Sequence, residues 1–407
     1  MPEISLDEGS VVTRGFRRVR LALSIAAAAL ALAACTNSAF DRLGAGEPVQ
    51  QPVEQPAAGG NIGAGQIRVG LILPLSAQGN AAIAAASMKN AAEMALAEFK
   101  DPNIQLLVKD DAGSPQGAQL AAQQAIDEGA ELIVGPLFAQ SVSAVGSVAR
   151  SRNIPVIAFS TDASVAARGV YLLSFLPESD VKRIVDFSAS RGKRSFAALL
   201  PDNAYGAVVE AALQQEVARR GGRVLAIEKY PLDPGRMAEP VRRVAQQAGS
   251  VDSILIADGA DAVPQVVQAL TAGGINTKRV QLLGTGLWDD PRIFNTPALE
   301  GGWFAAPESN GFRSFATRYR ARYGNDPVRT ATLAYDAVAL VAALVKTQGP
   351  QRFSEQILTN SSGFAGIDGI FRFRSDGTSE RGLAVMKVAP GGAQPVSPAP
   401  KSFSPGT

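Results

Sequence analysis

Ile67-Arg-Val-Gly-Leu-Ile-Leu73 is a mostly apolar run of strand length, and it ends in the turn-forming residues Pro74-Leu75-Ser76-Ala77-Gln78-Gly79-Asn80. The next stretch repeats apolar residues at spacings of three and four, which predicts a helix with one apolar stripe. The stripe consists of Met88, Ala91, Met94, Ala95 and Phe99. This order of strand, turn and helix is the unit from which the fold is predicted.

The same unit recurs along the chain. Strand-like runs at 104–109, 131–135 and 155–159 alternate with helical runs at 116–127 and 141–150. A second series begins at residue 195, with strands at 195–200, 224–230, 253–257 and 280–283 and helices at about 205–220, 236–247 and 261–272. Strands that alternate with helices predict a parallel sheet. We therefore expect an α/β protein with two Rossmann-like lobes.

Composition excludes several classes of function. The chain has 407 residues, more than one core usually holds, so two domains or lobes are expected. It has no histidine and one cysteine, which removes Ser-His and Cys-His couples, histidine-ligated zinc and internal disulfides. The chain has 39 Lys and Arg residues and 37 Asp and Glu residues, so its net charge is +2. This balance gives no electrostatic reason for binding nucleic acid. We expect no enzyme activity, no cofactor and no metal site.

The N-terminus has the pattern of an export signal. Four arginines (Arg14, Arg17, Arg18 and Arg20) precede an almost uncharged run at 21–34, which is too short to cross a bilayer that needs about 20 apolar residues. Leu32-Ala33-Ala34-Cys35 resembles the bacterial lipobox, which implies cleavage before Cys35 and acylation of that cysteine. The alternative is a buried N-terminal helix with one core cysteine. The residue directly after the cysteine is Thr36, and not the aspartate that resembles an inner-membrane retention signal in many Gram-negative lipoproteins. Attachment to the outer membrane is therefore favoured.

Two segments are predicted to lack a core of their own. Residues 35–66 carry the cysteine and a Pro/Gly-rich tether, and residues 391–407 are expected to be a disordered tail. Before this tail, Ile370-Phe-Arg-Phe-Arg374, Ser375-Asp-Gly-Thr378 and 383–388 predict a hairpin, because Asp-Gly is a strong turn signal.

Several motifs together resemble the type I periplasmic binding proteins, in particular the leucine/isoleucine/valine-binding family. They are Ile67 to Asn80, Asp110-Asp111 with Gly113-Ser114-Pro115, Gly135-Pro136-Leu137 and Ile154-Pro-Val-Ile-Ala158. The resemblance implies two lobes joined by three crossovers, near 173–179, 303–309 and 361–370, which close on a small solute. Lobe 1 would comprise 67–175 plus 305–362, and lobe 2 would comprise 176–304 plus 363–390.

Candidate ligand residues lie where strands lead into helices, because ligands of open α/β sheets bind beyond the carboxyl ends of the strands. The candidates are Ser76, Gln78, Ser141, Ser160, Thr161 and Asp162 in lobe 1, and Tyr205, Asp258 and Trp288 in lobe 2. Each could instead be ordinary turn chemistry, and Trp288 could be a core or hinge residue.

The resemblance carries over unevenly to the ligand site. In the amino-acid binders, lobe 1 hydroxyl and backbone groups hold the α-carboxylate, and a lobe 2 acid pairs with the α-amino group. Asp162 stands where the family commonly has a small hydroxyl residue, and Thr285-Gly286-Leu287-Trp288 replaces the expected glutamate.

Two functions follow from the resemblance. One is capture of a small polar solute, an amino acid or a related molecule, in the periplasm for an ABC permease. The other is a lipoprotein similar to the penicillin-binding-protein activators, which contacts a peptidoglycan synthase. In both, the membrane is reached only through the lipid anchor, and no nucleic acid is bound.

Overall fold

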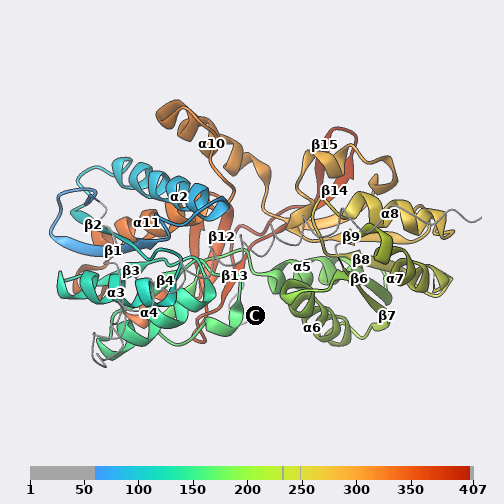
Figure 1. Ribbon diagram of the computed structural model, residues 1–407, viewed down its shortest axis with the longest axis horizontal. Helices are drawn as coiled ribbons and strands as arrows, with labels where there is room; N and C mark the ends of the chain where they lie inside the picture. The colour runs from blue at the N-terminus through green and yellow to red at the C-terminus, as the bar shows by residue number, and fades with distance from the viewer. Residues whose placement is uncertain (1–59, 232, 248, 404–407) are drawn as a thin grey trace, which may run out of the picture. The chain divides into compact units, whose positions relative to one another are not determined.

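Two large sheets organise the described part of the chain, which is residues 60–403 except 232 and 248 of the computed structural model (Figure 1). The predicted signal peptide, Cys35 and residues 36–59 of the tether lie outside the described residues. We call the residues packed on the first sheet lobe 1 and those packed on the second sheet lobe 2. The predicted α/β fold with two parallel-sheet lobes is confirmed.

The lobe 1 sheet has five parallel strands in the order β2-β1-β3-β4-β5. They are β1 (Ile67–Leu73), β2 (Ile104–Asp110), β3 (Leu132–Val134), β4 (Val156–Ala158) and β5 (Val170–Leu172). The helices α2 (Asn80–Ala97), α3 (Pro115–Asp127) and α4 (Ala139–Ser151) alternate with them, and the 3₁₀ turn η1 (Ala163–Val165) follows β4. Consecutive strand residues are buried, as expected for a sheet covered on both faces.

Local chemistry places the turns at the carboxyl edge of this sheet. Ser114 caps α3, because its hydroxyl accepts a hydrogen bond from the Gly117 amide at 3.0 Å, and Pro115 suits the first helical position. Gly135 follows β3 with φ +94°, and a Cβ there would lie 2.0 Å from the Ile72 carbonyl oxygen. Only glycine fits this position, which leads into α4.

The lobe 2 sheet has seven strands in the order β15-β14-β10-β9-β8-β6-β7. They are β6 (Ser195–Pro201), β7 (Arg223–Tyr230), β8 (Ser253–Ile256), β9 (Gln281–Gly284), β10 (Trp303–Ala306), β14 (Ala384–Ala389) and β15 (Gly392–Ser397). β14 and β15 are antiparallel to their neighbours, and the other five strands are parallel. The helices and 3₁₀ turns are α5 (Pro177–Ser190), α6 (Ala204–Arg219), α7 (Pro234–Gln246), α8 (Val263–Ala272), η2 (Gly286–Trp288), α9 (Pro291–Phe294) and η3 (Pro297–Leu299).

The chain returns to lobe 1 after β10. The returning elements are α10 (Ser309–Tyr323), α11 (Ala331–Thr347), η4 (Gly349–Gln351) and α12 (Glu355–Leu358). Leu333, Val338 and Val341 of α11 enter the same core as Met88 of α2, and Figure 1 shows the two helices side by side. The apolar character of α11 is explained by this burial.

The predicted return to lobe 2 at residue 363 is wrong. β11 (Phe364–Gly366), β12 (Gly369–Phe373) and β13 (Ser379–Arg381) form a small antiparallel sheet, and Phe371 and Phe373 are buried in the lobe 1 core. The predicted hairpin turn is present, but β12 pairs with β13 and not with 383–388. Strand β14, which contains most of that segment, belongs to the lobe 2 sheet, so the chain crosses at about residue 382.

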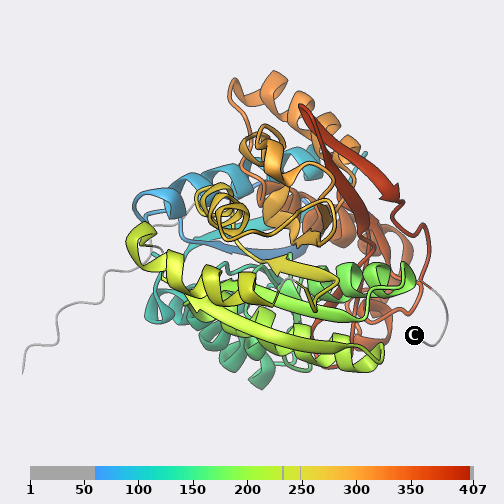
Figure 2. The same ribbon diagram turned by 90° about the vertical axis from the view of Figure 1, so that its right-hand side faces the viewer.

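The tail predicted to be disordered contains a strand. β15 pairs antiparallel with β14, and the two appear as adjacent dark red strands in Figure 2. Beyond β15, the Phe403 ring lies under Arg372 of β12, with 4.5 Å between the guanidinium carbon and the ring centroid. At the other end, Ile62 of the predicted tether exchanges backbone hydrogen bonds with Leu106 at 3.0 and 2.8 Å. Contacts to neighbouring strands hold the described parts of both segments, which begin at residue 60 and end at residue 403.

Within residues 60–403, no helix combines the length and apolar composition needed to cross a bilayer.

Candidate functional site

Ser76 and Gln78 lie at the carboxyl edge of the lobe 1 sheet, as predicted, and both are exposed. The Ser76 amide donates to Asp110 Oδ1 at 3.2 Å, and the Ala112 amide donates to the same oxygen at 2.8 Å. Asp110 therefore ties the turn after β1 to the turn after β2. The Gln78 side chain donates a long hydrogen bond of 3.5 Å to the Ser76 carbonyl oxygen.

Ser141 and Asp111 lie beneath this edge. Both residues have 0% exposure, and neither Ser141 Oγ nor Asp111 Oδ2 has a geometrically acceptable hydrogen-bond partner among the described residues. Burial, with a smaller effect from the neighbouring Asp110 charge, raises the pKa of Asp111 to about 6. Ser141 therefore stays a prediction, because its hydroxyl is covered in this structure.

Ser160, Thr161 and Asp162 form one turn. The Asp162 amide donates to Ser160 Oγ at 3.1 Å, and Asp162 Oδ1 accepts from the Ser164 amide at 2.9 Å. The carboxylate thus caps the 3₁₀ turn η1. Asp162 stabilises its own turn, and its carboxylate acts on a neighbouring acid: burial, with a smaller effect from Asp162, raises the pKa of Glu178.

Two helices begin at this edge without a side-chain cap. Gly79 precedes α2 and Phe138 precedes α4, and neither supplies a side-chain hydrogen bond to the first turn. The first N–H groups of a helix have no intrahelical acceptor, and together with the helix dipole they attract anions. The carboxyl edge of lobe 1 can therefore hold a negatively charged group.

In lobe 2, Tyr205 and Asp258 are held by hydrogen bonds to neighbouring side chains. The Tyr205 hydroxyl lies 2.8 Å from Thr285 Oγ1, and burial raises the pKa of Tyr205. The Tyr230 hydroxyl donates to Asp258 Oδ2 at 2.8 Å, while Asp258 Oδ1 accepts from the Gly259 amide at 2.7 Å. Both side chains follow parallel strands and lie at the carboxyl edge of the sheet.

Asp180, in the first turn of α5, was missed by the sequence analysis. Its Oδ2 accepts a hydrogen bond from the Gly286 amide at 2.9 Å, directly after β9 and beside Thr285. Burial raises the pKa of Asp180 to about 7. The glutamate that the resemblance implies directly after β9 is replaced by Thr285-Gly286-Leu287-Trp288, for which Asp258 and Asp289 are the possible substitutes in sequence, and the carboxylate of Asp180 reaches this loop from another element. Acidic residues in the first turn of a helix are a visible signal, although only the tertiary structure brings this one to β9.

A second group missed from the sequence lies where the chain passes between the lobes. Arg329 binds Asp368 with two hydrogen bonds of 2.9 and 2.6 Å. Although burial alone would raise the pKa of Asp368, the hydrogen bonds and charge of Arg329 lower it. Phe175 lies in the first crossover, and the guanidinium carbons of Arg329 and Arg381 are each 4.8 Å from its ring centroid. These contacts hold the crossover against α11 and β13.

Trp288 is a core residue, so its predicted role as a ligand contact is not supported. The side chain is 0% exposed, and its indole N–H donates to the Ile256 carbonyl at 3.0 Å. A Cβ on Gly284 would lie 2.1 Å from the ring, which shows how closely the backbone packs on it. The ring has no exposed face on which a ligand could stack. The alternative given for Trp288, a core residue, therefore accounts for this side chain.

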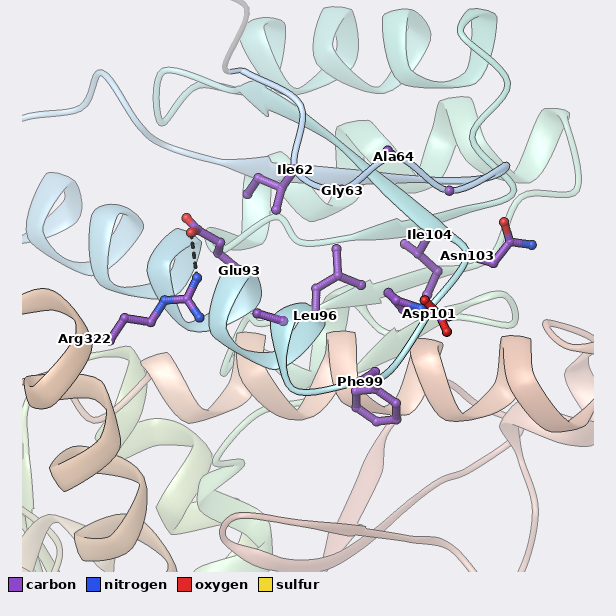
Figure 3. Close-up of a pocket in the computed structure, with 13 residues that line it drawn as sticks. Ile62, Gly63, Ala64, Glu93, Leu96, Phe99, Asp101, Asn103, Ile104 and Arg322 are labelled. Atoms are coloured by element: carbon purple, nitrogen blue, oxygen red, sulfur yellow. Dashed lines mark hydrogen bonds and ion pairs between the residues drawn. The ribbon is translucent and has the colours of Figure 1, made fainter.

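A hollow of about 630 Å³ lies elsewhere, at the amino edge of the lobe 1 sheet (Figure 3). Residues 62–65, the end of α2 and the turn before β2 line it, together with Arg322, whose guanidinium pairs with Glu93 at 3.0 Å. None of the predicted ligand residues lines this hollow. Its position opposite the carboxyl edge separates it from the candidate site.

Two α/β lobes with polar groups at the carboxyl edges of parallel sheets define a class of ligand-binding proteins. A family model described as periplasmic binding protein matches residues 66–393, and the chain belongs to this family. Its members are non-enzymatic, in agreement with the expectation that the chain is no enzyme. The predicted relationship to the type I branch is confirmed.

Solved structures share the fold. A putative branched-chain amino acid ABC transporter protein from Rhodospirillum rubrum is 21% identical, with TM-score 0.71 and coverage of 81% of this chain and 99% of that one. A substrate-binding protein from Desulfitobacterium hafniense in complex with Leu is 18% identical, with TM-score 0.59 and coverage of 81% and 99%. A solute-binding protein from R. palustris in complex with benzoate is 18% identical, with TM-score 0.57 and coverage of 84% and 98%.

An uncharacterized protein of Rickettsia prowazekii is 23% identical over 188 residues. The match covers 46% of this chain and 49% of that protein, so it spans about half the length of the curated relative.

Proposed function

We propose that this protein captures a small zwitterionic solute, an amino acid or a related molecule, and delivers it to an ABC-type importer. In this proposal the protein is periplasmic and attached to a membrane through Cys35, with the outer membrane favoured. The observation that carries the proposal is the opposite polarity of the groups at the carboxyl edges of the two lobes.

Lobe 1 offers groups that suit an anion. The uncapped first turns of α2 and α4 present backbone N–H groups, and the exposed Ser76 lies four residues before α2. The carboxylates at this edge, Asp110, Asp111 and Asp162, accept hydrogen bonds from backbone amides, which lessens their repulsion of an anion without cancelling it. A ligand carboxylate would therefore be held mainly by backbone groups, as in other helix N-terminal anion sites.

Lobe 2 offers groups that suit a cation. Asp180 reaches the end of β9 beside the Tyr205–Thr285 pair, and Asp258 lies at the end of β8. A carboxylate with a pKa of about 7 gains in ionisation when a positive charge binds next to it. Asp180 is therefore the residue that we expect to pair with a ligand ammonium group. Contacts to both lobes at once would favour a closed state of the lobes.

The test compares two ligands that differ in the ammonium group. Leucine carries both charges, and benzoate carries only the anion; solved relatives are reported with each. The fragment 55–407, which contains both lobes, would be melted with each ligand. A ligand at about 100 times its Kd stabilises by about 2.7 kcal/mol, a readily measured shift. We expect a shift with leucine or another amino acid, and its loss in Asp180→Asn.

Asp326→Asn serves as the control, because it removes an exposed carboxylate that belongs to lobe 1. A shift with benzoate alone would contradict the zwitterionic ligand but keep solute capture. No shift with any small solute, combined with retention of a peptidoglycan synthase on the immobilised protein, would support the activator-like alternative. The polar tether and the covered Ser141 hydroxyl are the observations that favour this alternative.

A further inference from the structure

The amino edge of the lobe 2 sheet gathers positive charge. Strands β7, β6, β8 and β9 are neighbours and parallel, so the loops that enter them lie along one edge. This edge is opposite the one that carries the candidate ligand site. We call the cations of these loops and of the helix and strand ends that flank them the basic edge: Arg191, Lys193, Arg194, Arg219, Arg220, Arg223, Lys278 and Arg279.

Few acids balance these eight cations. Arg219 and Arg220 pair with Asp186 at 2.6 and 2.5 Å, and Arg219 also pairs with Glu216. Asp252 is engaged by the backbone amides of Arg194 and Ser195 at 2.8 and 2.9 Å. Among the residues described, the other six cations of the basic edge form no ion pair within 4.0 Å. The edge therefore has an excess of five positive charges over these three acids.

The corresponding edge of lobe 1 lacks this excess. The exposed cations there are Arg68, Lys100, Arg150, Arg152 and Arg168, and Arg168 pairs with Glu355. The neighbouring acids are Glu98, Asp101, Glu128 and Glu131. Because both lobes have the same α/β plan, the charge of the basic edge is a property of this surface and not of the fold.

We propose that the basic edge docks on the anionic phospholipid surface of the membrane that holds the chain. Charge complementarity supports this partner, because exposed Lys and Arg are attracted to anionic lipid headgroups within a Debye length. The predicted anchor at Cys35 would keep the protein close to that surface. The part of the tether before lobe 1, residues 36–59, is long enough to span up to about 80 Å. The anchor would therefore keep the basic edge at a high effective concentration near the membrane, so weak attraction would suffice for docking.

A hollow beside the basic edge has room for a headgroup phosphate. Its volume is about 540 Å³, and three arginines line it with Ser190 and one acid, Asp186. The arginines are Arg183, Arg191 and Arg220, of which Arg220 pairs with Asp186. Arg183 already donates to the Leu383 carbonyl and to Ser397 Oγ, each at 2.7 Å, which holds its guanidinium in place. The surface thus combines the flexible Lys and Arg side chains of the basic edge with Arg183, whose guanidinium is held by hydrogen bonds.

The experiment measures attachment without the lipid anchor. Residues 55–407 would be sedimented with vesicles of equal parts phosphatidylglycerol and phosphatidylcholine, and with vesicles of phosphatidylcholine alone. We expect binding only to the anionic vesicles and its loss at high salt. Each Lys or Arg near an anionic surface increases the membrane affinity about fivefold. The triple variant Lys193→Gln, Arg223→Gln, Arg279→Gln should therefore bind on the order of 100-fold more weakly.

The matched control is Lys100→Gln, Arg150→Gln, Arg152→Gln, which removes three cations from the amino edge of lobe 1. It should retain nearly all binding. The chosen side chains on both edges make no hydrogen bond or ion pair among the described residues, so both variants should fold. Equal binding to both vesicle types would overturn the proposal, as would equal losses in the two variants. Capture of an acidic protein by the basic edge without vesicle binding would also overturn it.

Discussion

The two lobes share one architecture but present different chemistry at equivalent places. At the carboxyl edges, lobe 1 shows uncapped helix starts and hydroxyl groups, whereas lobe 2 shows Asp180, Asp258 and Tyr205. At the amino edges, lobe 1 has mixed charges and lobe 2 has the basic edge. The parallel sheet determines where loops meet, and the residues in the loops determine what binds there.

The largest predicted effect concerns the core of lobe 2. Trp288→Ala removes a fully buried ring and leaves a cavity, so we expect a loss of about 4 kcal/mol in the free energy of unfolding. Denaturation by urea would measure it. Leu287→Ala is the control, because Leu287 is 47% exposed and should cost little. A stable Trp288→Ala protein that had lost only ligand binding would restore Trp288 to the site.

A smaller effect concerns pH, and it compares Asp180 of lobe 2 with Asp336 of α11 in lobe 1. Burial raises the pKa of each carboxyl to about 7, against about 4 in an unfolded chain. Between these values the folded chain keeps the proton that the unfolded chain releases, so stability falls as pH rises from about 4 to 7. Above pH 7 the loss from each group is complete.

Asn cannot titrate, so Asp180→Asn should gain stability relative to the original chain as pH rises. We expect a relative gain on the order of 2 kcal/mol between about pH 5 and pH 8, measured by urea unfolding at each pH. Asp336→Asn should behave similarly in lobe 1. Parallel pH profiles for the variants and the original chain would show that neither buried carboxyl titrates in this window.

The smallest effect concerns the first turn of α4. Phe138 precedes the helix without capping it and is 38% exposed, so Phe138→Asp adds a cap and loses the packing of a partly buried ring. The cap contributes about 1 kcal/mol, which the lost packing offsets, so we expect no net gain in stability but weaker binding of a carboxylate ligand, because the new cap occupies the same N–H groups. Thermal melts with and without ligand separate the two effects. Stronger ligand binding would argue against an anion site at α4.

Much of the fold was predictable from local sequence. The run 67–73 and its repeats predicted the parallel strands, because strand and helix periodicities differ and depend on nearby residues. Phe371 and Phe373 were assigned to the wrong lobe, because an alternating apolar strand can cover either core. β15 was missed, since its pairing with β14 depends on a neighbouring edge that composition does not reveal.

The candidate site likewise contains residues whose position the sequence predicted and residues that it did not reveal. The position of turn residues such as Ser76, Tyr205 and Asp258 at the carboxyl edges could be predicted because they follow strands, and strand ends of one sheet meet at one edge. Asp180, Arg329 and Arg381 were not found, because they lie in a helix, at a helix approach and in a short strand that carry no binding motif.

By itself, the sequence determined the order of elements, the two-lobed plan and the turns that reach the carboxyl edges. These depend on periodicity and on turn chemistry, which act over a few residues. Only the tertiary structure decided that Asp180 meets Gly286, that Phe175 lies between two arginines and that Trp288 is enclosed. Such contacts join residues far apart in the chain, and packing alone selects among the many pairings that the local pattern allows.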